Sequence, residues 1–182
     1  MAHLLTGLRL VVVVPSALAF ARWAFDAPLW PAAFVALAIA TDYFDGIVAR
    51  ARGTASSAGQ LFDHSTDFLF VTGGLAGASS AGAIPLALPL LIVVAFTQYV
   101  LDSYILGRMK RLRMSKLGRW NGILYFVPLV VIALARLPVP SGVAESLSLL
   151  ALFVSWLLVI STVASIIDRA VASIPKPAPP QG

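Results

Sequence analysis

Four aspartates with fixed spacing form the most reactive part of the chain. They are half of its eight acidic residues, and they follow the pattern D-x2-D-G-x2-A-R-x8-G-x3-D-x3-D as Asp42, Asp45, Asp63 and Asp67. Converging carboxylates offer only oxygen ligands, which favour hard divalent cations such as Mg²⁺ or Mn²⁺. Two such ions side by side can stabilise the attacking and leaving oxygens of a phosphoryl transfer. The spacing therefore predicts metal-dependent transfer of a phosphoryl or phosphatidyl group.

The same spacing predicts how the aspartates are held. The first two are three residues apart and the last two are four apart, so each pair lies on one face of a helix. If the chain turns near Thr54, Asp45 lies nine residues before the turn and Asp63 nine after it. The outer pair then lies twelve and thirteen residues from the turn. At about 1.5 Å per residue, all four carboxylates lie at matched depths, roughly 13–20 Å from the loop.

Small residues and an arginine accompany the aspartates. Gly46 follows Asp45, and Gly59 lies one turn before Asp63, so side-chain bulk is absent beside two carboxylates. Arg50 lies one turn beyond Gly46, where a guanidinium suits a phosphate or pyrophosphate. The alternative for a membrane carboxylate is an ion pair with arginine or a place in an ion or proton relay.

Composition places these residues in a membrane protein. The 182 residues are 59% hydrophobic and 12% charged, with a mean hydropathy of +0.91, whereas a soluble domain has about 25% charged residues. There are no cysteines and only two histidines, which excludes thiolate and histidine-rich metal sites. We predict an all-α integral membrane protein.

Six apolar segments have about the length of 20 residues that a spanning helix needs. They are predicted at about 5–25, 28–49, 60–81, 84–106, 119–137 and 145–167. Together they form one six-helix membrane domain over residues 1–170. The proline-rich tail, 171–182, is predicted to be disordered. The apolar run before Ala17-Leu18-Ala19 resembles a cleavable leader, but it continues beyond that point, and we expect it to remain as the first span.

The basic residues predict the orientation. Six of them lie in one linker, as Arg108, Lys110, Arg111, Arg113, Lys116 and Arg119. With both termini in the cytoplasm, eleven basic residues face inward and only Arg22 and Arg136 face outward, as the positive-inside rule requires. The net charge of +5 thus reflects topology and not nucleic-acid binding. The aspartates are predicted at the cytoplasmic face of the cell inner membrane.

The aspartate pattern resembles the signature of the CDP-alcohol phosphotransferase family, also called CDP-alcohol phosphatidyltransferases. Eight fixed positions within 26 residues agree, namely Asp42, Asp45, Gly46, Ala49, Arg50, Gly59, Asp63 and Asp67. The six-span layout is also similar. The resemblance implies transfer of a phosphate-linked group from a CDP-activated donor to an alcohol, with release of CMP. It also implies a homodimer.

The resemblance assigns roles to the matching residues. The four aspartates would bind two divalent cations, Mg²⁺ or Mn²⁺. The segment with Gly46, Ala49 and Arg50, together with Gly59 opposite, would hold the CDP group. Asp67 would be the general base that deprotonates the acceptor hydroxyl, provided that its pKa suits that hydroxyl.

Two shorter stretches resemble bacterial phosphatidylglycerophosphate synthases and related cardiolipin synthases. They are the opening Leu4-Leu5-Thr6-Gly7-Leu8-Arg9, with Pro15 beyond, and Ser115-Lys116-Leu117-Gly118-Arg119. We therefore predict transfer of phosphatidyl from CDP-diacylglycerol to a polar alcohol, with glycerol 3-phosphate as the best candidate. Inositol, serine and phosphatidylglycerol-type acceptors remain alternatives.

The chain also departs from the pattern of those synthases. His64 and Phe68 replace a usual proline and lysine, and Asn121 stands where a second lysine is usual after Gly118. Fewer cations in an acceptor pocket would favour another alcohol, unphosphorylated ones included.

Several roles stay open at this point. His64 is either an acceptor contact or a packing residue, and Asp102 either joins the site or pairs with Arg108. The basic linker, residues 108–119, either binds phosphate and anionic headgroups or sets topology alone. A cation or proton transporter and a family member without activity are the competing functions.

Overall fold

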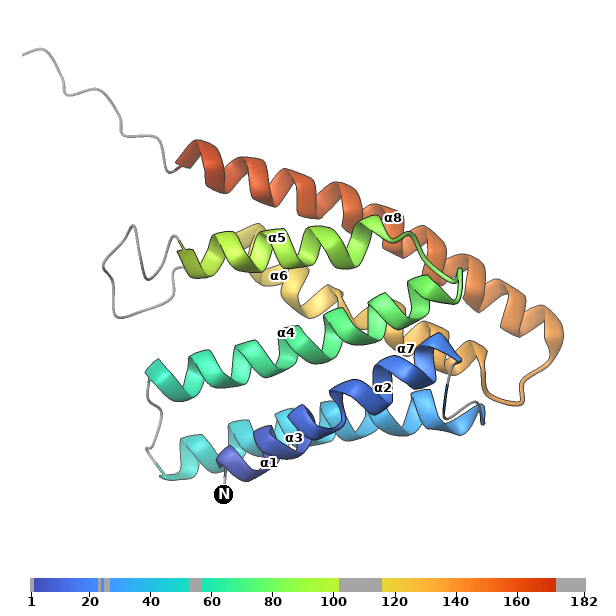
Figure 1. Ribbon diagram of the computed structural model, residues 1–182, viewed down its shortest axis with the longest axis horizontal. Coiled ribbons are helices and arrows are strands. Elements are labelled where there is room, and N and C mark those ends of the chain that lie inside the picture. The colour runs from blue at the N-terminus through green and yellow to red at the C-terminus, as the bar shows by residue number, and fades with distance from the viewer. Residues whose placement is uncertain (1, 23, 25–26, 53–56, 102–115, 173–182) are drawn as a thin grey trace, which may run out of the picture.

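The computed structural model describes residues 2–22, 24, 27–52, 57–101 and 116–172, and no strand occurs among them. Eight helices make up the described part of the fold (Figure 1). They are α1 (Ala2–Val11), α2 (Val13–Ala21), α3 (Leu29–Arg52), α4 (Ser57–Ser80), α5 (Ala87–Leu101), α6 (Lys116–Leu124), α7 (Phe126–Ala135) and α8 (Ser141–Ala172). The predicted all-helical class is confirmed for the described residues.

Two of the six predicted segments are each divided into two helices. The first breaks at Val12, three residues before Pro15, and the fifth breaks at Tyr125, three residues before Pro128. A proline inside a helix has no N–H to donate and its ring crowds the preceding turn, so the helix bends or stops there. Each divided segment therefore changes direction inside the bundle instead of running straight.

The helix ends gather at two ends of the bundle (Figure 1). The start of α1, the end of α3 and the start of α4 lie at one end, with the end of α5, the start of α6 and the end of α8. The turn between α4 and α5 lies at the other end, where Gly82 adopts a φ of 74° and the amide of Ala83 bonds back to the Ala78 carbonyl at 3.0 Å. Because left-handed backbone strains most side chains, glycine suits this turn. The helix α8 continues to Ala172, beyond which residues 173–182 are outside the description.

Glycines on α4 let α2 pack directly against its backbone. A Cβ added to Gly77 would collide with the backbone carbonyl oxygen of Ala17, and one added to Gly74 would lie 3.0 Å from the Leu129 side chain. Small residues at such crossings allow helices in a membrane to approach closely. The buried residues Phe20, Phe70 and Leu75 fill the core beside this contact.

Replacing Gly77 by alanine should therefore destabilise the bundle. The new methyl group meets backbone, which cannot rotate away, and overpacking of this kind costs about 3 kcal/mol of unfolding free energy. Thermal unfolding of the detergent-solubilised protein measures the loss. Gly142→Ala is the matched control, because a Cβ there meets nothing within 4 Å, and its melting temperature should equal that of the wild type. Equal melting of both variants would contradict the close contact.

An arginine closes the end of α2. Its last turn leaves carbonyl groups without helical partners, and Arg136, which follows α7, donates to two of them, Ala19 O at 2.7 Å and Phe20 O at 2.6 Å. The same guanidinium lies 5.6 Å from the Phe20 ring centroid. These contacts fix the end of α7 to the end of α2.

Apolar side chains also cover the outside of the bundle. Leu149, Phe153, Leu157 and Ile160 on α8 are each at least half exposed, as in a helix that faces lipid rather than water. Two described helical stretches, Leu117–Ala135 and Ser141–Val171, have the length and hydropathy to cross a membrane. Thr6–Ala21, Leu29–Phe44 and Ala87–Leu101 are apolar but shorter. The helix α4 carries two aspartates and several small polar residues, which lower its hydropathy.

Candidate active site

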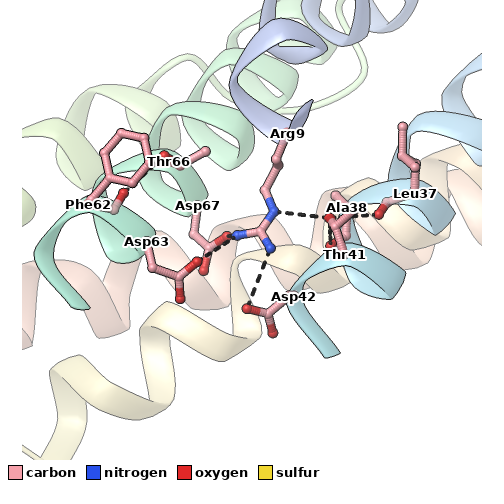
Figure 2. A network of polar contacts seen from close by, with 9 residues as sticks. All are labelled: Arg9, Leu37, Ala38, Thr41, Asp42, Phe62, Asp63, Thr66 and Asp67. Carbon is pink, nitrogen blue, oxygen red and sulfur yellow. Dashed lines mark hydrogen bonds and ion pairs between the residues drawn. The ribbon is translucent and has the colours of Figure 1, made fainter. Parts of the chain in front are cut away.

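Three of the four aspartates meet between α3 and α4. Each of Asp42, Asp63 and Asp67 has a carboxylate oxygen within 4.8 Å of the other two (Figure 2). Asp42 lies on α3, and the other two lie one turn apart on α4. The helical spacing thus turns both α4 carboxylates to one face. The third carboxylate lies opposite them because α1 packs against both α3 and α4.

A guanidinium from α1 lies in the middle of these three carboxylates. Arg9 Nη1 bonds to Asp67 Oδ1 and, at 3.2 Å, to Asp63 Oδ1, while Nη2 lies 3.7 Å from Asp42 Oδ1. Figure 2 shows the side chain entering between α3 and α4. Arg9 has no exposed surface, and a buried charge is tolerated when it is paired. The three acidic groups and Arg9 form one electrostatic unit, which we call the Arg9 cluster.

Threonines hold the backbone and the guanidinium in place. Thr41, 4% exposed, accepts from Arg9 Nε at 3.3 Å and shares its hydroxyl proton between the Leu37 and Ala38 carbonyls, at 2.8 and 2.9 Å. Thr66, between the two α4 aspartates, donates to the Phe62 carbonyl at 2.9 Å. Hydroxyls satisfied inside their own helix turn allow polar residues to lie at this depth.

The cluster is closed on one side and open on the other. The exposed fraction of the side chain is 0% for Arg9, 25% for Asp67, 33% for Asp63 and 56% for Asp42. The carboxylates are therefore reachable by ions and ligands, whereas the guanidinium is reachable only past them.

The remaining residues of the aspartate pattern lie on the same two helices. Asp45, Gly46, Ala49 and Arg50 are on α3, and Gly59 is near the start of α4. Their side chains are outside the described part, so the fourth carboxylate and the predicted CDP-binding segment are placed only by helix and register. Asp102 and linker residues 102–115 also lie outside the described residues.

Sequence reasoning did not identify Arg9 as a site residue. It entered the prediction as an inward-facing charge and as part of a short N-terminal pattern. The signal was nevertheless present, because an arginine inside an apolar segment is by default a functional candidate whose partner must be sought.

A cavity adjoins the Arg9 cluster on the side away from α3. It has a volume of about 130 Å³ and is open to the outside, and Asp67 and His64 form part of its wall. Its described lining comes from α4, α5, α6, α7 and α8, with no residue of α1, α2 or α3. Most of the wall is apolar, and Arg169 also lines it. His64 is thus a cavity residue, and Asp67 belongs both to the Arg9 cluster and to this cavity.

The acidic groups have the chemistry that a divalent cation requires. Three converging carboxylates supply oxygen ligands only, which fits Mg²⁺ or Mn²⁺ and not a softer ion. Arg9 already places one positive charge among them. The three carboxylates could thus hold a divalent cation.

Comparison with known proteins agrees with this assignment. A family model for CDP-alcohol phosphatidyltransferases matches residues 1–167, which is nearly the whole chain. No curated protein and no solved structure matches it. The family model spans the aspartate pattern and all eight helices up to the last turn of α8. The chain belongs to the CDP-alcohol phosphatidyltransferase family and is a transferase of phospholipid synthesis.

Proposed function

We propose that the protein transfers a phosphatidyl group from CDP-diacylglycerol to a polar alcohol and releases CMP. Glycerol 3-phosphate is the first acceptor to test. The observation that carries the proposal is the convergence of Asp42, Asp63 and Asp67 within 4.8 Å of one another in a chain of this family. The reaction takes place at the cytoplasmic face of the inner membrane, and the protein acts as a homodimer.

Two divalent cations, Mg²⁺ or Mn²⁺, would be held by the four aspartates, Asp45 included. When bound, they supply positive charge that offsets the charge developing on the phosphoryl oxygens. The CDP group lies along the α3 side, against Gly46, Ala49 and Arg50, with Gly59 leaving room on α4. Arg50 supplies a guanidinium to the pyrophosphate.

Asp67 is the general base because it alone among the three clustered aspartates also borders the cavity. An alcohol in the cavity can present its hydroxyl to Asp67 while the donor lies on the opposite, α3 side. The carboxylate takes the hydroxyl proton as the new phosphoester bond forms. Holding donor and acceptor on two sides of one residue supplies the alignment that a bimolecular transfer needs.

Release of CMP tests this proposal directly. Purified protein in lipid nanodiscs should release CMP from CDP-diacylglycerol only when an alcohol acceptor and Mg²⁺ or Mn²⁺ are both present. Addition of EDTA should stop the release, and excess Mg²⁺ should restore it. The absence of CMP with every acceptor in a panel of glycerol 3-phosphate, inositol, serine and phosphatidylglycerol would overturn the proposal.

A further inference from the structure

We infer that the preferred acceptor is an amphiphilic alcohol, with an apolar body and a single negative charge, and that the cavity beside Asp67 holds it. The inference rests on the proposed function and names its substrate class. Such an alcohol fits the cavity better than a small, doubly charged sugar phosphate or glycerol phosphate.

The wall of the cavity is a continuous aromatic surface. The Phe68 ring, next to Asp67 in the chain, stacks on Phe96 with centroids 4.0 Å apart and planes 9° apart. The Phe96 ring in turn lies 5.9 Å from the Tyr99 ring. An apolar body gains free energy by covering such a surface, whereas a hydrated dianion loses its water there without replacement.

One guanidinium lies at the end of this aromatic surface. The Arg169 Cζ atom is 5.4 Å from the centroid of the Tyr99 ring. Among the described lining residues, Arg169 is the only one with a permanent positive charge. Asp67 contributes a negative charge to the same cavity. Arg169 can pair with one anionic group on the acceptor.

A buried amide gives the cavity a position for a hydroxyl. Gln98 lines it, and its Nε2 donates to the Ile166 carbonyl at 3.3 Å. Its Oε1 atom is buried and accepts no hydrogen bond from the described residues. A buried acceptor without a donor is costly, so a hydroxyl of the ligand would satisfy it. An acceptor with two hydroxyls could thus address Gln98 and Asp67 together.

Asn121 stands where the related synthases usually carry a second lysine, and this position lies outside the cavity wall. Asn121 on α6 is 2% exposed and accepts through Oδ1 from the Ser161 hydroxyl at 2.7 Å. It lies between α6 and α8 and is not part of the cavity lining. The neighbouring Gly122 does line the cavity, and a Cβ there meets nothing within 4 Å.

The acceptor fits this cavity better than the acyl chains of the donor do. The predicted CDP-binding segment is on α3, and no described residue of α1, α2 or α3 lines the cavity.

In the transfer, the acceptor oxygen bonds to the phosphatidyl phosphorus while the bond from that phosphorus to the CMP oxygen breaks. The electron pair leaves with CMP, and the hydroxyl proton passes to a carboxylate oxygen of Asp67.

Two acceptors with the same glycerol phosphate unit make the test. Glycerol 3-phosphate is small and carries a phosphate monoester, whereas phosphatidylglycerol carries one negative charge, two free hydroxyls and two acyl chains. Purified protein in nanodiscs with CDP-diacylglycerol and Mg²⁺ receives both, and mass spectrometry measures the ratio of four-chain to two-chain product. We expect the four-chain product to dominate in the wild type.

Variants connect that ratio to the cavity. Gly122→Leu adds bulk at a lining position where a Cβ meets nothing within 4 Å, and it should lower the yield of four-chain product at least about tenfold. Phe68→Lys, which adds a cation to the wall, should shift the ratio toward glycerol 3-phosphate. Gly142→Leu is the control, because its Cβ also meets nothing within 4 Å but lies at the start of α8, far from the cavity. Melting temperatures close to that of the wild type would show that all three variants fold.

Each contrary result has its own meaning. CMP release with glycerol 3-phosphate but no four-chain product would overturn the inference and leave the proposed function standing. A rise in the KM for CDP-diacylglycerol in Gly122→Leu, without a change for the acceptor, would assign the cavity to the donor's chains and also overturn it. No CMP with either acceptor in the wild type would count against the proposed function itself.

Discussion

Asp67→Asn should reduce the rate of CMP release by about 10²–10⁴-fold, the range typical of a lost general base. The amide keeps the size of the side chain and one oxygen ligand, but it cannot accept the hydroxyl proton. It also keeps a polar partner for Arg9, so the fold should survive. Steady-state CMP release with saturating acceptor and Mg²⁺ measures the loss.

Two measurements separate the base from a simple metal ligand. Stabilisation by Mn²⁺ against thermal unfolding reports metal binding, and it should persist in Asp67→Asn because two other carboxylates of the Arg9 cluster remain. Glu145→Gln, an exposed carboxylate-to-amide change on α8, should retain wild-type turnover. Wild-type turnover in Asp67→Asn would remove this residue from the base role.

Arg9→Met should have the largest effect on stability in the absence of metal. Methionine fills similar space but removes the positive charge between Asp42, Asp63 and Asp67, which leaves three carboxylates facing one another. Removing one partner of a buried ion pair costs about 3–5 kcal/mol. In EDTA the melting temperature of Arg9→Met should therefore fall well below that of the wild type.

Divalent cations should then restore part of this stability. A ligand that binds only the folded state raises its stability with concentration, and a variant without the competing guanidinium should gain more from Mg²⁺ than the wild type does. Arg119→Met, on the exposed surface of α6, controls for loss of one charge and should melt as the wild type in both conditions. An equal response of Arg9→Met and wild type to Mg²⁺ would contradict the view that Arg9 and the cations share one site.

The aspartates illustrate what a sequence can predict. Asp63 and Asp67 share a helix face because a helix has a fixed period. Asp42 lies at a similar depth because only four residues separate α3 from α4. Local rules of this kind depend on few residues. The family followed from the same spacing, and the match over residues 1–167 confirmed it.

The role of Arg9 and the presence of the cavity were not predicted from the sequence. Arg9 is 54 residues from Asp63, and their contact depends on how α1 packs against α3 and α4. The cavity wall combines residues from five helices, and no local pattern in the sequence shows that these helices meet around one space. The helix breaks near Pro15 and Pro128 were not predicted for another reason. Both prolines stand in the sequence, but each apolar segment is long enough to be interpreted as one continuous span.

The glycine contact between α2 and α4 sets a register for the chemistry. Along one side of α4, Gly77 meets Ala17, and ten residues earlier Asp67 meets Arg9, eight residues before Ala17. The two contacts therefore join α4 to two successive helices, α2 and α1, at two heights along its length. A shift of one residue at the contact between Gly77 and Ala17 would move Arg9 by about 1.5 Å along α4. That shift is enough to separate the guanidinium from the Asp67 carboxylate. A glycine without any reactive group thus sets the alignment on which the charged end depends.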